Sequence, residues 1–326
     1  MNRIVESAGP FIPDESAPDV FAHLSVQPAI LAGGSLKWPW PLSREHALNT
    51  LIDSIDNESL LEATLRCLDA AFVVAAHSIQ AGGTLATATP LLVCCEDVQR
   101  HTRQRAGSVC RPVRRVLEPV SRDTAPALTV AALTARAMAM AGDDPIDPIV
   151  VGVPADHVIA DHAAFGVALA EALVHASHGA IVTLAVPPQR VTTRYGYIRM
   201  GTMLGTRGAR RIERFVEQPD AERAERYVAS GEYWWNSGMC VVRASVWLSA
   251  IKLCRPVIAA ACGDAFDHAS LDDAGALHLA RDAFTICPSD SIDYAVMERV
   301  ATDARFVGVA VPLVAGWSEA GAWGTA

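Results

Sequence analysis

The strongest constraint on the fold is a regular alternation of short apolar runs with longer segments of helical periodicity. Apolar runs of strand length lie at residues 26–34, 90–95, 148–157 and 180–186, and helical patterns lie between them at residues 58–76, 125–141 and 163–176. Strands that are apolar along nearly their whole length are typical of a parallel sheet covered by helices on both faces. The alternation therefore predicts an α/β fold with a doubly wound, mostly parallel sheet.

The pattern changes near Tyr195, where shorter strand candidates follow one another. These candidates lie at residues 195–200, 210–219 and 236–245, and a closing strand is expected at residues 305–314 after further helices. We expect this part of the chain to bind substrate and to be built onto the same sheet.

The chain is expected to divide into an arm and one domain. Residues 1–24 are polar and contain prolines, and we expect them to be poorly ordered. Residues 25–326 are expected to form a single domain with halves at 25–190 and 191–326. Within the first half, residues 80–90 (QAGGTLATATP) indicate a flexible insertion between a helix and a strand.

Charge and length exclude several function classes. The chain has 326 residues, a net charge of −9 and a pI near 5.6, whereas proteins that bind nucleic acid or anionic membranes need clustered positive charge. Its first residues lack the basic start and apolar run of a secretory signal, and no stretch reaches about 18 uncharged apolar residues. We therefore expect a cytoplasmic protein with a small-molecule ligand.

The eight cysteines contain no C-x-x-C pair. Cys94 and Cys95 fall in an apolar strand, where neighbouring side chains point to opposite faces. We expect the cysteines to be reduced core residues rather than metal ligands or redox groups.

Two strand ends carry residues suited to binding phosphate and metal. In an open parallel sheet, ligands bind at the carboxyl ends of the strands. Gly33 and Gly34 follow the first strand, where they could let backbone N–H groups approach a phosphate or could simply form a turn. Asp156 follows another strand, where it could hold Mg²⁺ or could only cap the next helix.

Nine short blocks occur in an order and spacing that resemble one enzyme family. The blocks are AILAGG, PLSRE, LEPVSRDTAPA, VPADHVIADHAAF, YGYIR, FVEQPD, SGEYWWNSGM, SIDYAVME and GWSEAGAW. The chain is similar to the mannose-1-phosphate guanylyltransferases, which make GDP-mannose in bacteria, from about Pro28 to Trp323. This resemblance implies a Rossmann-like nucleotidyltransferase fold of the GT-A kind. It also implies that the phosphate of mannose 1-phosphate attacks the α-phosphorus of GTP, and that pyrophosphate leaves with the help of Mg²⁺.

The resemblance further implies roles for three groups of residues. The nucleotide would be held by Leu31, Ala32, Gly33, Gly34, Arg122 and Thr124, the Mg²⁺ ion by Asp156 and Glu319, and the mannose by Gly196, Glu217 and Asn236. Residues 25–190 would then be the nucleotide-binding half and residues 191–326 the sugar-binding half of a nucleotidyltransferase-like domain. The residues themselves agree in part, because Glu217 and Asn236 are polar groups in apolar, aromatic surroundings, as in a sugar pocket.

Aromatic residues near Asn236 leave two interpretations open. Trp234 and Trp235 could stack on a sugar or pack in the core. Tyr195 and Tyr197 alternate along an expected strand, so only one of them can face the cleft.

Three basic residues of the family are replaced in this chain. The arginine after the double glycine is Trp38, a later Pro-Lys pair is Leu48 and Asn49, and the lysine of Phe-Val-Glu-Lys-Pro is Gln218. Because nucleotidyl transfer needs cations that offset phosphate charge, these changes predict weakened activity. Lys37 and Arg44 are the candidate catalytic surrogates, and Arg194, which replaces a glycine of the family, lies nearby.

Two functions therefore stay open. The first is a mannose-1-phosphate guanylyltransferase of reduced activity, and the second is a non-catalytic relative that binds a GDP-mannose-like ligand or regulates an active paralogue. Enzymes of this family usually continue past the GWSEAGAW block into a β-helical segment that helps them dimerise, and we expect no such C-terminal domain in this chain, which ends at Ala326. The sequence leaves open whether the protein forms a homo-oligomer or a hetero-oligomer, and which nucleotide and sugar it prefers.

Overall fold

The computed structural model describes residues 23–32, 54–55, 58–79, 83–97, 99, 112–142 and 146–319. The expected arm lies outside these ranges except for its last two residues, and Leu24 already begins the first strand. Gly33, Gly34, Lys37 and Arg44 also lie outside the described residues.

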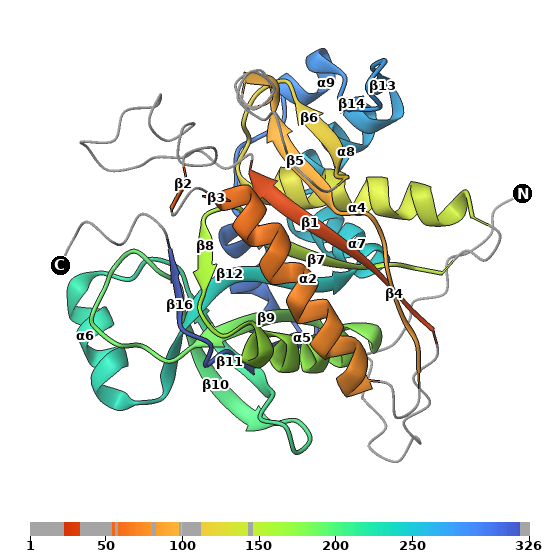
Figure 1. Ribbon diagram of the computed structural model, residues 1–326. Helices are drawn as coiled ribbons and strands as arrows, with labels where there is room; N and C mark the ends of the chain where they lie inside the picture. Colours follow the sequence, from red (N-terminus) through yellow and green to blue (C-terminus); the bar gives the residue numbers. More distant parts are fainter. Residues whose placement is uncertain are drawn as a thin grey trace, which may run out of the picture.

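Four parallel strands form the centre of the sheet (Figure 1). They are β6 (Arg114–Glu118), β5 (Leu91–Cys95), β1 (Leu24–Ala32) and β7 (Ile149–Pro154), in that spatial order. The register places Leu31 opposite Pro154 and Ala32 opposite Cys94, so the carboxyl ends of these strands lie at one edge. The prediction of a doubly wound α/β sheet is confirmed here.

The other half of the sheet is mixed. Antiparallel β12 (Tyr233–Arg243) lies between β7 and β9 (Ile181–Val186), and β15 (Gly308–Pro312) pairs parallel to β9. Beyond them, β10 (Tyr197–Met203) and β11 (Arg210–Val216) pair antiparallel, because the short connection between them cannot contain a crossover helix. Both halves of the chain thus contribute strands to one sheet, which has 12 strands within the described residues.

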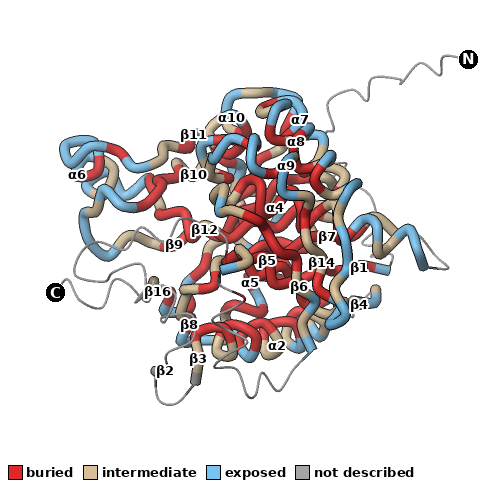
Figure 2. Tube along the Cα trace, turned by 90° about the horizontal axis from the view of Figure 1, so that it is seen from above, coloured by how far each residue is buried: buried red, intermediate tan, exposed pale blue. Residues whose placement is uncertain are grey.

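Helices cover both faces of the sheet, and Figures 1 and 2 show the buried strands between them. One face carries α2 (Leu60–Ile79) and α5 (His162–Ser177), and the other carries α4 (Thr124–Met140), α7 (Ala244–Cys254) and α8 (Pro256–Asp267). The alternation of β1 explains this division. Val26 and Ile30 belong to the core of the first layer, whereas Ala29 and Leu31 belong to the core of the second.

Some elements were not expected. Residues 80–90 are not wholly a flexible insertion, because β4 (Leu85–Thr87) pairs parallel to the start of β1. A second small sheet joins β8 (His157–Ile159) to β16 (Trp317–Glu319). The remaining elements are β2 (Ser54–Ile55), β3 (Glu58–Ser59), α6 (Ala221–Ser230), β13 (Ser270–Leu271), β14 (Leu277–His278), α9 (Arg281–Thr285), the π-helical turn η1 (Asp293–Met297) and α10 (Glu298–Val300).

Two other expectations can be checked in the described part of the chain. Its seven cysteines are free thiols, six of them buried, as expected for core residues, while Cys110 lies outside. Among the helices described, none has the length and apolar character needed to cross a membrane.

Candidate active site

A cleft of about 650 Å³ opens at the carboxyl edge of the sheet. Its walls come from the turn after β7, the segments before β10 and after β11, the middle of β12, the end of β16, and the loop before η1. They include Asp123, Thr124, Pro154, Asp156, His157, Arg194, Tyr195, Gly196, Glu217, Gln218, Asn236, Asp290, Asp293 and Glu319. The fold therefore brings together most of the described residues that were predicted for the site.

The small β8–β16 sheet places the two predicted metal carboxylates, Asp156 and Glu319, on the wall of the cleft. Glu319 pairs with His157, the residue after Asp156, and Trp317 Nε1 donates a hydrogen bond of 3.3 Å to His157 Nδ1. Burial raises the pKa of Glu319 to about 7, and the nearby charge of Asp156 adds to the rise. Two adjacent carboxylates of this kind favour a bound cation.

Asp156 does not cap the following helix. The N-cap of α5 is Asp161, whose side chain accepts a hydrogen bond of 2.9 Å from Ala164 N. The alternative interpretation of Asp156 as a helix cap is therefore wrong, and its carboxylate is left at the cleft.

The carboxylates of Asp156 and Glu319 fit the ligand preferences of Mg²⁺. Among the described residues there is no group of three or more His, Cys, Asp or Glu side chains that could hold a metal ion. Mg²⁺ is commonly held by only one or two carboxylates, with water and substrate phosphates completing its octahedral shell. Asp156 and Glu319 supply such a pair of hard oxygen ligands on the cleft wall.

The predicted sugar-binding residues lie together on the wall of the same cleft. Asn236 N donates a hydrogen bond of 2.8 Å to Gly196 O. A Cβ at Gly196 would lie 2.5 Å from Glu217 Oε2 and 3.3 Å from Asn236 Cβ, so any side chain there would have to displace the Glu217 carboxyl group. The structure thus places Gly196 against both Glu217 and Asn236, and the role of the three residues in binding mannose stays a prediction.

Two carboxyl groups, those of Glu217 and Asp293, line the same cleft as Asn236. Asn236 accepts from Thr183 Oγ1 at 2.7 Å and donates to Asp293 Oδ1 at 2.8 Å. The Oε2 atom of Glu217 is buried and has no hydrogen-bond partner. Burial raises the pKa of both Glu217 and Asp293, and for Glu217 the charge of Asp293 adds to the rise. Protonated carboxyl groups can both donate to and accept from sugar hydroxyl groups.

The nucleotide-binding prediction receives less support from the described residues. Leu31 and Ala32 lie at the buried end of β1, and Thr124 lines the cleft. Arg122 is not part of the cleft wall, since its guanidinium donates to Thr285 O, and its Nε is buried without a partner. Its role in holding guanosine stays a prediction, as do the roles of Gly33, Gly34, Lys37 and Arg44 outside the described residues.

Of the aromatic residues near Asn236, some pack in the core and one lines the cleft. Trp235 is 4% exposed and packs edge-on against Tyr195, with ring centroids 5.2 Å apart. Neither Trp234 nor Trp235 lines the cleft, so both pack in the core. Tyr195 faces the cleft, whereas Tyr197 is buried and donates its hydroxyl hydrogen to Thr192 O at 2.8 Å.

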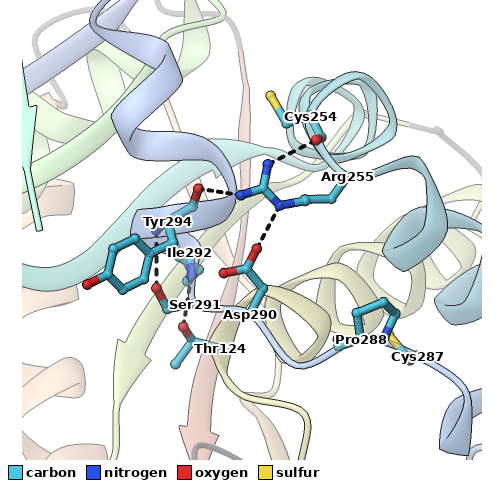
Figure 3. A network of polar contacts seen from close by, with 9 residues as sticks. All are labelled: Thr124, Cys254, Arg255, Cys287, Pro288, Asp290, Ser291, Ile292 and Tyr294. Atoms are coloured by element: carbon cyan, nitrogen blue, oxygen red, sulfur yellow. Dashed lines mark hydrogen bonds and ion pairs between the residues drawn. The ribbon is translucent and has the colours of Figure 1, made fainter.

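Arg255 fixes the position of the loop before η1, which lines the cleft (Figure 3). Its guanidinium donates to Asp290 Oδ2 at 2.7 Å and to Tyr294 O at 2.9 Å. Thr124 Oγ1 accepts from Ile292 N at 3.0 Å and fixes the same loop from α4. Sequence reasoning missed Arg255, because nothing in the linear sequence joins it to a loop that begins more than 30 residues later.

Two further features of the structure were also missed, one on the cleft wall and one in the core. Asp123 and Gln218 line the cleft with φ of 71° and 42°, values that non-glycine residues rarely adopt and that concentrate at functional sites. Glu118 ends β6 fully buried, with no partner for either carboxyl oxygen, and burial raises its pKa to about 8. No signal for Glu118 was available in the sequence, because β6 begins with two arginines and was not predicted as a strand.

Comparison with known proteins decides the family. Residues 27–323 match the profile of the nucleotidyl transferases. The chain belongs to the nucleotidyl transferase family. This agrees with the cleft at the carboxyl edge of the sheet, and nucleotidyl transferases generally use divalent metal ions and act on a nucleoside triphosphate and a phosphorylated partner.

Curated relatives of this nucleotidyl transferase include two bacterial proteins. Xanthan biosynthesis protein XanB from Xanthomonas campestris pv. campestris is 42% identical over 300 residues, which are 91% of this chain and 58% of XanB. Mannose-1-phosphate guanylyltransferase RfbM from Salmonella typhimurium is 36% identical over 301 residues, which are 92% of this chain and 58% of RfbM. The chain therefore spans somewhat more than half the length of these relatives.

A solved structure supports the fold of this nucleotidyl transferase. A protein from Thermus thermophilus named mannose-1-phosphate geranyltransferase is 28% identical, with a TM-score of 0.70 and coverage of 91% of this chain and 77% of that one. The expected nucleotidyltransferase fold is thereby confirmed.

Proposed function

We propose that this protein is a mannose-1-phosphate guanylyltransferase that joins GTP and mannose 1-phosphate to give GDP-mannose and pyrophosphate. One observation carries the proposal. A single cleft is lined both by the carboxylate pair Asp156 and Glu319 and by the trio Gly196, Glu217 and Asn236. A sugar phosphate bound by the trio would direct its phosphate toward the carboxylate pair, where the reacting phosphates of GTP would lie.

The reaction needs positioning and charge neutralisation more than proton transfer. A phosphate oxygen of mannose 1-phosphate forms a bond to the α-phosphorus of GTP, the bond to the β-phosphate oxygen breaks, and pyrophosphate leaves with the electron pair. Mg²⁺ held by Asp156 and Glu319 would offset the phosphate charge. The attacking phosphate is already ionised at neutral pH, so no general base is required.

His157 fits a structural role in this scheme. Its ring is buried, burial lowers its pKa, and Nδ1 accepts the indole hydrogen of Trp317. The neutral ring packs edge-on against Trp317 at a centroid distance of 5.2 Å. His157 therefore supports the β8–β16 pairing that presents Asp156 and Glu319, rather than moving a proton.

A second function is favoured by the charge of the cleft. Six acidic side chains line it within the described residues, namely Asp123, Asp156, Glu217, Asp290, Asp293 and Glu319, against a single arginine, Arg194. A cleft with so few cations binds triphosphate weakly. The second candidate is accordingly a non-catalytic protein that binds a GDP-mannose-like ligand or regulates an active paralogue.

Pyrophosphate release from GTP and mannose 1-phosphate in the presence of Mg²⁺, measured beside a calorimetric titration with GDP-mannose, separates these functions. Turnover supports the enzyme, and binding without turnover supports the second candidate. If the protein neither turns over nor binds, both are wrong.

A matched pair of variants tests the metal site in the same assay. Asp156→Asn should lower turnover by about 10²- to 10³-fold, because it removes charge from the metal-binding pair. Asp273→Asn makes the same chemical change at an exposed position outside the cleft and should leave turnover unchanged.

A further inference from the structure

Arg194 is distinctive because it is the one permanent cation on the wall of an acidic cleft, within the described residues. The other basic side chain there, His157, is buried, and its Nδ1 already accepts a hydrogen bond from Trp317 Nε1. A phosphorylated sugar brings negative charge into a site already lined by carboxylates. Such a ligand needs a cationic side chain at its phosphate in addition to any metal ion.

The backbone around Arg194 is firmly held. Arg194 N donates to Thr192 Oγ1 at 3.2 Å. The next residue, Tyr195, is wedged between Trp235 and Trp317, with ring centroids 5.2 Å and 5.4 Å away. Gly196 is then tied to β12 through Asn236 N.

The side chain of Arg194, in contrast, is free to meet a ligand. It is exposed, and its guanidinium makes no hydrogen bond or ion pair with another described residue. Most other arginines near the cleft are engaged, as Arg255 is with Asp290 and Arg199 is with Glu213 and Glu232. A fixed backbone with an unengaged guanidinium suits a contact that forms only when substrate binds.

Arg194 belongs to a short segment that lines the cleft beside predicted site residues. The next residue, Tyr195, lines the cleft and packs against Trp317, which lies two residues before Glu319. Gly196 follows and accepts a hydrogen bond of 2.8 Å from Asn236 N. A sugar 1-phosphate bound in the cleft would therefore lie beside the segment that carries Arg194.

We propose that Arg194 binds the phosphate of the sugar phosphate and is a specificity-determining cation of this protein. This inference rests on the proposed function and adds to it the residue that selects a phosphorylated sugar. The planar guanidinium can form two parallel hydrogen bonds to phosphate oxygens.

The first test compares Arg194→Gln with Arg211→Gln, an exposed arginine of β11 outside the cleft. Arg194→Gln should lower kcat/KM for mannose 1-phosphate by about 10²- to 10³-fold, while Arg211→Gln should leave it unchanged. Equal values of kcat/KM for mannose 1-phosphate in the two variants would overturn the proposal.

The second test is rescue from another position. Gln218 lines the same cleft, so Gln218→Lys should restore kcat/KM of Arg194→Gln by about tenfold or more if the missing group is a phosphate-binding cation. If Arg194 only neutralises Glu319, the Mg²⁺ dependence changes instead, the KM for mannose 1-phosphate does not, and the proposal is wrong.

A binding measurement keeps this inference separate from the proposed function. Calorimetric titration with mannose 1-phosphate alone requires neither turnover nor recognition of guanine. A wild-type protein without turnover that binds mannose 1-phosphate, and loses this binding in Arg194→Gln, would contradict the enzyme and support Arg194. Equal binding in both proteins, or none in the wild type, would contradict Arg194 when turnover is also absent.

Discussion

Asn236 donates its Nδ2 hydrogen to Oδ1 of Asp293 at 2.8 Å, and this bond joins β12 to the π-helical turn η1 where both residues line the cleft. The other amide atom, Oδ1, accepts from Thr183 at 2.7 Å, so the Asn236 side chain is fixed in one orientation. Single π-helical turns often occur at functional sites. Here the turn brings Asp293 to a strand more than 50 residues earlier in the chain.

Asp293 is therefore expected to position Asn236 for the sugar. Asp293→Ala leaves the buried amide without its acceptor, which costs about 1–3 kcal/mol, and should raise the KM for mannose 1-phosphate by about 10- to 100-fold. Asp293→Asn retains an acceptor oxygen and should behave much closer to wild type. The KM for mannose 1-phosphate is measured for both variants by steady-state kinetics. An equal rise in KM for Asp293→Ala and Asp293→Asn would show that the charge of Asp293, rather than its hydrogen bond to Asn236, is important.

A side chain at Gly196 should disturb the Glu217 carboxyl group. An added Cβ would lie 2.5 Å from Glu217 Oε2 and 3.2 Å from Phe215 Cζ, so Gly196→Ala must displace the Glu217 carboxyl group. We expect kcat/KM for mannose 1-phosphate to fall by at least about tenfold.

Gly263 provides the matched control for this substitution. A Cβ added at Gly263 in α8 meets no atom within 4 Å, so Gly263→Ala should stabilise the helix by roughly 0.5–1 kcal/mol and leave activity unchanged. If Gly196→Ala keeps wild-type kinetics, Glu217 does not contact the sugar from its present position.

Much of this arrangement could be predicted from the sequence, because the information was local. The strands β1, β5, β7 and β9 are apolar along most of their length, and Asp156 follows one of them directly. By contrast, β6 was not predicted, since it begins with Arg114 and Arg115.

The unpredicted parts of the site depend on contacts between distant segments. Arg255 acts on a loop that only the packing of α8 brings near, and the left-handed φ of Asp123 and Gln218 has no signature in residue type. Antiparallel insertion of β12 between β7 and β9 is likewise a matter of tertiary pairing rather than of local pattern.

Removing Arg255 should loosen the cleft loop and lower stability. Its bonds to Asp290 at 2.7 Å and to Tyr294 O at 2.9 Å involve a charged donor, and such bonds contribute about 1.5–3 kcal/mol each. We expect Arg255→Ala to lower the melting temperature and to weaken GDP-mannose binding. Arg281→Ala, which removes an exposed arginine paired with Glu96, should cost at most about 1 kcal/mol. Similar melting temperatures for the two variants would contradict this role.

Glu118 should make the free energy of unfolding depend on pH. Burial raises its pKa from 4.5 to about 8, so the folded protein holds a proton that the unfolded chain releases near pH 4.5. The contribution of Glu118 to stability is then fully present below pH 4.5 and is lost as the pH rises to about 8.

Glu118→Gln keeps the shape of the neutral carboxyl group without the titration. Unfolding by urea at several pH values should show wild type losing stability relative to Glu118→Gln by about 3–5 kcal/mol between pH 4.5 and 8, since each pKa unit corresponds to 1.36 kcal/mol. Parallel stability curves for the two proteins would mean that Glu118 is ionised in the folded state and has a partner there.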